Sequence, residues 1–139
     1  MTQNQTKDEL KNLIKAELVK NKDDIDRSIL NSVKLLKDLL VIEDGTGKIR
    51  LLNPRIFKNS EKIKLLLMGK YLASLSGVTN DASVNLNIIA SELDIPKTTL
   101  SGPLSDLVRQ NIVKKPADNT YAINPSRIEE EVLKLVKNE

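Results

Sequence analysis

The order of the apolar patterns between residues 60 and 123 restricts the fold of this chain more than any other feature of the sequence. Helical and strand patterns follow one another there, separated by short turns rich in Gly, Pro, Asn and Asp. The patterns predict, in order, a helix at 60–76, a strand at 84–86, a helix at 87–94, a helix at 96–112 and a hairpin at 113–123. We therefore expect a mainly α fold with short β-hairpins.

The apolar residues available for a core are almost all aliphatic. Of the 139 residues, 40% are hydrophobic and 29% are charged, which is typical of a soluble folded protein. Only Phe57, Tyr71 and Tyr121 are aromatic. Because the core must be built from Leu, Ile and Val, we expect helices to pack on helices, either in one core or in two very small domains that share an interface.

Two further helices and a hairpin are predicted in residues 1–58. Apolar residues have helical spacing within 7–20 and again from Asp24 onward. The first stripe contains Leu10, Leu13, Ile14 and Leu18, and the second contains Ile25, Ile29, Val33, Leu36 and Leu40. Asp44-Gly45 then stands between two short apolar runs, which is a strong signal for a β-hairpin. The stripes hold more leucine than one small core needs, so part of them should meet another surface.

Two segments of the chain share one local pattern. Residues 39–56 and 110–128 each run from a helix end through a hairpin to an Asn-Pro pair and an Ile-containing helix start. Identity between the two segments is low. A tandem repeat and a common hairpin-to-helix pattern both explain the echo, and both alternatives stay open.

The chain contains no Cys and no His. Disulfides, thiolate zinc sites, thiol nucleophiles and imidazole acid–base chemistry are therefore excluded. No acidic cluster indicates a metal site, no Gly-rich loop indicates a phosphate cofactor, and the "DGTG" at 44–47 is explained as a hairpin turn. We expect neither enzyme activity nor a cofactor. No apolar run approaches the ~20 residues of a membrane span and no signal peptide is visible, which predicts an intracellular protein.

The stretch "IIASELDIPKTTLSGPLSDLVRQNIVKK", with "TYAINP" after it, resembles the winged helix-turn-helix superfamily, and in particular regulators of archaeal or bacterial type. It is similar to their pattern of Ala-x-x-Leu, a turn with a small polar start, Leu-x-x-Leu and a hydrophobic hairpin. The matching positions are Ala90, Leu93, Ile95, Thr98, Thr99, Leu100, Leu104, Leu107, Ile112, Val113 and Tyr121. The resemblance implies a winged helix-turn-helix domain over residues 59–139.

The same resemblance implies that the protein binds duplex DNA, as a cytoplasmic, nucleoid-associated transcriptional regulator or DNA-organising factor. The third helix, at 96–112, would then enter the major groove, and the hairpin at 113–123 would act as the wing. Residues 1–58 would be a helical dimerisation region or a degenerate second winged helix. A two-fold symmetric homodimer would place two third helices about 34 Å apart, one turn of DNA.

Gly102 and Pro103 stand in the middle of the predicted third helix. A proline there removes a backbone hydrogen bond and costs about 3 kcal/mol. On a helical wheel, the core side carries Leu100, Pro103, Leu104, Leu107 and Val108. The opposite side carries Thr98, Gly102, Ser105 and Arg109, with Asp106 at its edge. Small, hydroxylated and basic residues suit a helix that enters a DNA groove, so the Gly-Pro pair is compatible with this interpretation.

We predict DNA contacts from the outer side of the third helix and from the hairpin. The candidate residues are Lys97, Thr98, Thr99, Ser101, Ser105, Arg109, Lys114, Lys115 and Asn119. Taken singly, each is also explained as a solvated surface residue. Asn111 stands where such regulators usually have Gly, and Asn tolerates the left-handed backbone conformation that this turn needs.

Residues 48–70 contain seven basic side chains against Glu61 alone. This local excess predicts secondary phosphate contacts. The candidate residues for these contacts are Lys48, Arg50, Arg55, Lys58 and Lys62. The alternative is a lysine-rich surface that is only solvated.

A winged helix can also serve as a protein–protein interaction module within a larger complex, because the fold does not decide the function. The weak net charge of +3 and the acidic run Glu129–Glu131 favour this alternative. No pattern in the sequence indicates a small-molecule effector site.

Overall fold

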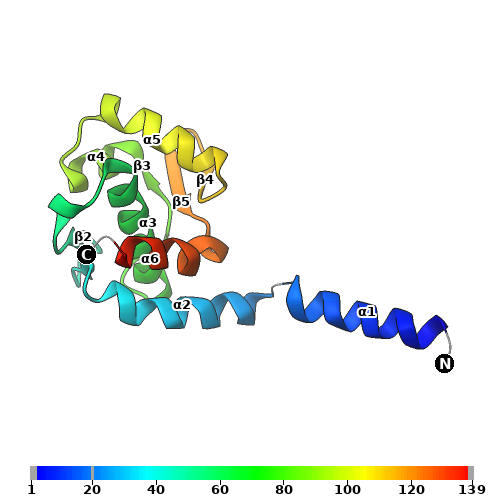
Figure 1. The fold of residues 1–139 in the computed structure, drawn as a ribbon. Coiled ribbons are helices and arrows are strands. Elements are labelled where there is room, and N and C mark those ends of the chain that lie inside the picture. The colour runs from blue at the N-terminus through cyan, green and yellow to red at the C-terminus, as the bar shows by residue number, and fades with distance from the viewer. Residues whose placement is uncertain (1–2, 20, 138–139) are drawn as a thin grey trace.

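The computed structural model describes residues 3–19 and 21–137 of the chain (Figure 1). The α-helices are α1 (Gln3–Glu17), α2 (Lys22–Leu36), α3 (Asn59–Leu75), α4 (Leu86–Leu93), α5 (Lys97–Arg109) and α6 (Ile128–Val136). The strands are β1 (Leu40–Ile42), β2 (Ile49–Leu51), β3 (Val84–Asn85), β4 (Val113–Ala117) and β5 (Thr120–Ile123). Short 3₁₀ helices at Pro54–Ile56 and Pro125–Arg127 precede α3 and α6. The fold is mainly helical with small antiparallel sheets, as the sequence predicts.

Helix α3 is the centre of the molecule, and α4, α5, α6 and both hairpins pack around it (Figure 1). Every residue from Ile63 to Lys70 is buried, including the two lysines Lys64 and Lys70. The segment is otherwise apolar, which is typical of a helix that neighbours cover on all sides. Both lysines were counted in the basic excess of residues 48–70, so part of that excess lies inside the protein.

Strand β5 is the middle strand of a three-stranded antiparallel sheet, between β3 and β4. Val84 pairs with Tyr121, and Val113 pairs with Ile123. Asn119, in the turn between β4 and β5, has a φ of 55°. The predicted hairpin at 113–123 is therefore confirmed, and the valine and isoleucine side chains of its base are buried in the core.

Strands β1 and β2 form a second hairpin, which confirms the prediction from Asp44-Gly45. The turn also contains Gly47, whose φ is 70° and where a Cβ would lie 2.2 Å from the methyl group of Thr79. Ile49 of β2 packs directly against Gly69 of α3, where a Cβ would lie 2.8 Å from the isoleucine side chain. Glycine at these two positions allows hairpin β1–β2 to lie close against its neighbours.

The side chain of Lys70 joins hairpin β1–β2 to two helices. Its Nζ donates hydrogen bonds to the carbonyl oxygen of Gly47 (3.1 Å) and to Oε2 of Glu92 in α4 (2.7 Å). The other carboxylate oxygen of Glu92 accepts a hydrogen bond from the backbone N–H of Ile49 (2.9 Å). Both charged side chains are largely buried, so each depends on the other for its counter-charge.

Helices α2 and α6 lie side by side on one side of α3 (Figure 1). The buried stripe of α6 consists of Ile128, Val132 and Leu135. Lys64 of α3 donates a hydrogen bond to Glu131 of α6 (2.9 Å), whose side chain is 1% exposed. Burial opposes ionisation of this carboxyl, but the hydrogen bonds from Lys64 and Lys134 outweigh it and hold the pKa of Glu131 below its usual value.

Helix α1 extends away from the rest of the molecule (Figure 1). Every side chain from Thr6 to Val19 is exposed, so the first predicted apolar stripe lies on a solvent-facing helix. In α2, Ile29 and Leu36 are buried, whereas Val33 of the same predicted stripe is exposed.

One cluster of buried side chains draws on residues from both sides of the predicted division at residue 58. Ile29 and Leu40 belong to this cluster together with Leu66 and Ile128. The two parts thus share one core in the folded chain. The division into residues 1–58 and 59–139 stays a prediction.

Several predicted boundaries differ from the structure by one to three residues, and two of the differences have identifiable reasons. The strand expected at 84–86 ends at Asn85, because the Asn85 side chain caps α4 by accepting a hydrogen bond from the N–H of Ile88 (2.9 Å). The helix expected at 96–112 ends at Arg109, because Asn111 takes a left-handed conformation with a φ of 61°. That conformation at Asn111 confirms the prediction made for this turn.

Candidate nucleic-acid interface

Helix α5 runs without a break from Lys97 to Arg109 and contains Pro103 in its interior. Leu100, Leu104 and Leu107 are buried, and Pro103 is half-buried beside them. The predicted core side of this helix is therefore confirmed. Because the proline faces the core, the opposite side of α5 stays a continuous exposed surface.

Gly102 lies on the exposed side of α5. Its φ is not in the left-handed region, so the backbone does not require glycine, and a Cβ built there would meet no atom within 4 Å. Glycine inside a helix costs roughly 0.5–1 kcal/mol relative to alanine. Neither the conformation nor the packing of this chain offsets that cost. The missing side chain leaves room for close approach of another molecule to the α5 backbone.

The N-terminal turn of α5 has no acidic residue and contains Lys97. Helix α4 likewise has no acidic residue there, whereas α2, α3 and α6 carry carboxylates in their first turns. Exposed backbone N–H groups and the positive end of the helix dipole attract anions, and an acidic side chain would compete with them. The start of α5 is thus suited to a phosphate group.

Strand β4 is an edge strand, and its residues after Val113 are exposed. Lys114 and Lys115 therefore project into solvent, and the Nζ of Lys115 lies 5.8 Å from the ring centroid of Tyr121. Lysine and Pro116 on an edge strand also discourage pairing with the edge of another sheet. Protection of the sheet edge and the predicted contact with phosphate both need these exposed lysines.

The exposed side of α5 meets the hairpin in a cleft of about 340 Å³. The cleft is lined by Ser105, Val108, Arg109, Lys115 and Tyr121. It brings together three residues that the sequence predicted for DNA contact, two from the helix and one from the hairpin. The helix and the hairpin therefore form one surface.

Arg109 forms an ion pair with Asp106 on the same exposed side of α5. The guanidinium side chain is 77% exposed. Exposed ion pairs of this kind contribute little free energy, so a phosphate can replace the carboxylate as the partner of Arg109.

All nine residues predicted for DNA contact are exposed. Lys97, Thr98, Thr99, Ser101, Ser105 and Arg109 lie on α5, Lys114 and Lys115 lie on β4, and Asn119 lies in the turn of the hairpin. The five residues predicted for secondary phosphate contacts are spread more widely over the surface. Three of them, Lys48, Arg50 and Lys62, line a cleft of about 240 Å³ that also contains Glu43 and Glu92. Lys58 lies beside Pro103, and Arg55 is exposed in the first 3₁₀ helix.

The residues that hold the hairpin in place were not predicted. The buried Nδ2 of Asn124 donates a hydrogen bond to the carbonyl oxygen of Asn111 (2.9 Å), and Arg127 donates one to the carbonyl oxygen of Gln110 (2.8 Å). These bonds tie the end of α5 to the segment after β5. The Asn-Pro pair at 124–125 was visible in the sequence, but its backbone partner is 13 residues away.

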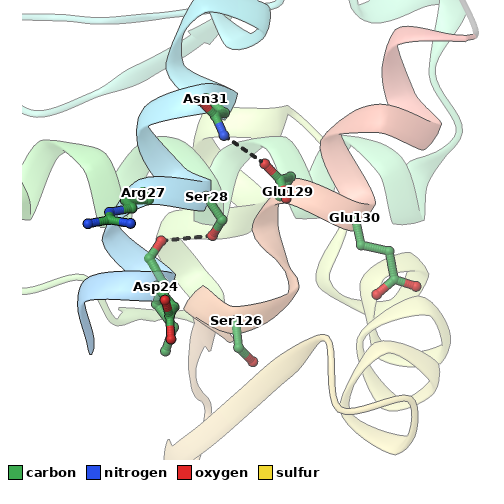
Figure 2. Close-up of a pocket in the computed structure, with 8 residues that line it drawn as sticks. Asp24, Arg27, Ser28, Asn31, Ser126, Glu129 and Glu130 are labelled. Carbon is green, nitrogen blue, oxygen red and sulfur yellow. Dashed lines mark hydrogen bonds between the residues drawn. The ribbon is translucent and has the colours of Figure 1, made fainter. Parts of the chain in front are cut away.

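Another cleft, of about 360 Å³, lies between α2 and the start of α6. Figure 2 shows Asp24, Arg27 and Asn31 from α2 and Glu129 and Glu130 from α6, with a hydrogen bond between Asn31 and Glu129 (3.4 Å). Its carboxylates outnumber the single arginine, which disfavours phosphate binding there. Helix α2 also lies on the side of the molecule opposite α5 (Figure 1).

Comparison with protein-family models, with curated proteins and with solved structures found no match. Within residues 3–19 and 21–137, no helix has the length and apolarity needed to cross a bilayer. The same described residues hold no group of three or more acidic side chains arranged to bind a metal ion.

Proposed function

We propose that the protein is a winged helix-turn-helix protein that binds duplex DNA as a homodimer, to regulate transcription or to organise DNA in the nucleoid. In this proposal α4 and α5 form the helix-turn-helix, α5 enters the major groove, and hairpin β4–β5 is the wing. The order of these elements and their packing around α3 support the assignment.

The observation that carries the proposal is the single exposed surface formed by α5 and hairpin β4–β5. It combines an acid-free helix N-terminus, a narrow side of small and hydroxylated residues, and cations at both edges. Cations hold phosphates by electrostatic attraction, while small side chains allow a helix to approach base edges. The acidic cleft between α2 and α6 lies on another side of the molecule, away from these cations.

A protein–protein interaction module is the second candidate function. Asp106 favours it, because this carboxylate stands on the exposed side of α5 and would face a phosphate backbone unfavourably. A protein partner with a basic residue would pair with Asp106 directly.

Binding to a random-sequence duplex across a series of salt concentrations tests the DNA proposal. Fluorescence anisotropy with wild type should show log K falling linearly with log salt, and Lys114→Ala/Lys115→Ala should reduce the slope by about 2. Lys34→Ala/Lys37→Ala on α2 removes the same charge far from the proposed surface and should leave the slope near that of wild type. Absence of binding at low salt would favour the protein-interaction function.

A further inference from the structure

Helix α1 presents an apolar surface that its own chain leaves exposed. Leu10, Leu13 and Ile14 are 57%, 58% and 41% exposed, and Leu18 is 75% exposed. A 15-residue helix is marginal in water unless its apolar face packs against something. The exposed stripe and the length of α1 together indicate a helix that is stabilised by a partner.

The charges of α1 are divided between the two sides of this stripe. On a helical wheel, Lys7, Lys11 and Lys15 lie on one side of its centre line, with Asp8 behind them at the back of the helix, whereas Glu9 and Glu17 lie on the other side. Together with Leu10, Ile14 and Val19, the lysines line a shallow hollow of about 380 Å³ that can receive side chains of another helix. A helix with the reverse distribution of charge along its facing edges would complement α1.

A second copy of α1 has that distribution when the two helices run parallel. In a parallel pair, the lysine side of each helix faces the acidic side of its partner. In an antiparallel pair, the two lysine sides would face each other and repel. A parallel pair also brings the rest of each chain, residues 21–137, to the same end of the pair. An antiparallel pair would separate these two parts by the length of α1, about 22 Å.

A lipid surface is a poorer partner for α1 than a second copy. The helix contains three lysines and three acidic residues, Asp8, Glu9 and Glu17, so its formal charge is zero. Helices that bind membrane surfaces usually carry an excess of basic residues over their polar face.

We propose that α1 is the dimerisation element of this protein and pairs in parallel with α1 of a second copy. The proposal deepens the proposed function, which requires a homodimer, by naming the surface that forms it. It is tested without DNA, so its failure and the failure of DNA binding are distinguishable. In such a pair the two-fold axis runs along the two helices.

Disulfide trapping tests this pairing cleanly, because the chain has no native cysteine. Leu10 lies near the centre line of the stripe, and Asn12 lies on the opposite side of α1. Under mild oxidation of the full-length chain, Leu10→Cys should form a covalent dimer on a non-reducing gel, and Asn12→Cys should not. In an antiparallel pair centred on Ile14, the two Leu10 positions would be about 12 Å apart and could not be bridged. Equal trapping of both variants, or trapping of neither, overturns the proposal.

Sedimentation equilibrium of Leu13→Gln/Ile14→Gln supplies the second test. Both residues are exposed in the monomer, so the thermal unfolding midpoint of the variant should equal that of wild type. Its dimer dissociation constant should rise by about 100-fold or more, because apolar side chains of both copies leave the interface. A wild type that remains monomeric up to roughly 100 μM, or a dimer that the double variant does not weaken, contradicts the assignment. Binding of wild type to anionic vesicles without self-association also contradicts it.

Discussion

Hairpins β1–β2 and β4–β5 are both followed by an Asn-Pro pair and by a 3₁₀ helix that begins at the proline. Their surroundings differ. The first hairpin is bound to α3 and α4 through Lys70, Glu92 and the close contact of Ile49 with Gly69. The second hairpin is joined to β3 along β5, whereas its other strand, β4, is an edge strand whose residues beyond Val113 are exposed.

The local pattern decides the turn and the next helix start, whereas side chains distant in the sequence decide what each hairpin contacts. Lys70 and Glu92 are 22 residues apart and neither lies in a hairpin. Where such partners exist, the hairpin becomes part of the body. Where such partners are absent, as along the edge strand β4 with its exposed Lys114 and Lys115, the strand is free to contact another molecule.

Removing the cation that binds hairpin β1–β2 should have the largest effect. Lys70→Ala leaves the largely buried carboxylate of Glu92 without its counter-charge, so the free energy of unfolding should fall by about 3–5 kcal/mol. Urea denaturation followed by circular dichroism measures the change. Lys48→Ala, an exposed lysine of the same hairpin, is the matched control and should stay within about 0.5 kcal/mol of wild type. Equal effects of both variants would refute the claim that Lys70 holds hairpin β1–β2 against α3 and α4.

The pH dependence of the free energy of unfolding should depend on the contact between Lys64 of α3 and Glu131 of α6, the helix that follows hairpin β4–β5. Because the folded pKa of Glu131 lies below the unfolded value of about 4.3, its ionised form stabilises the protein above that value. This contribution is lost as the pH falls through the folded pKa.

Glu131→Gln should therefore lower the free energy of unfolding at pH 7, by about 2–4 kcal/mol, since Lys64 stays buried without its partner. The variant should also flatten the loss of stability between about pH 5 and pH 3. Glu130→Gln, at an exposed neighbouring position, is the control. An unchanged acid limb in Glu131→Gln would show that the Lys64 pair does not govern it.

On the proposed DNA-binding surface, Arg109→Ala should weaken DNA binding by about 1 kcal/mol on every sequence, because we propose that Arg109 contacts phosphate. Thr98→Ala or Ser105→Ala should alter sequence preference more than affinity, if these hydroxyls read bases. Competition between a selected site and random duplex separates the two effects. Equal losses on both kinds of DNA for all three variants would remove the base-reading role.

The smallest effect, with opposite signs on folding and on binding, is expected at Gly102. Gly102→Ala meets no neighbouring atom, so helix propensity should stabilise the fold by up to about 1 kcal/mol. The added methyl group should weaken DNA binding if the α5 backbone approaches the duplex closely. A variant that is more stable and binds equally well would show that the glycine serves no contact.

The sequence was sufficient for those features that depend on neighbours in the chain. Periodicity predicted the helices and the core side of α5, and turn residues predicted both hairpins and the left-handed Asn111. The burial of Lys64 and Lys70 was not predictable, because a lysine shows its partner only when the chain is folded. The sequence predicted that part of the two apolar stripes would meet another surface, but not that this part is the stripe of α1, since an apolar stripe does not say which surface covers it.

The most direct test of the central claim is to map the backbone amide signals of the ¹⁵N-labelled protein that change when a short duplex is added. We predict that signals of α5 and of hairpin β4–β5 shift most, and that signals of the acidic cleft between α2 and α6 stay in place. Shifts that avoid α5 and β4–β5, or no shifts at low salt, would contradict the proposal that these two elements form a DNA-binding surface.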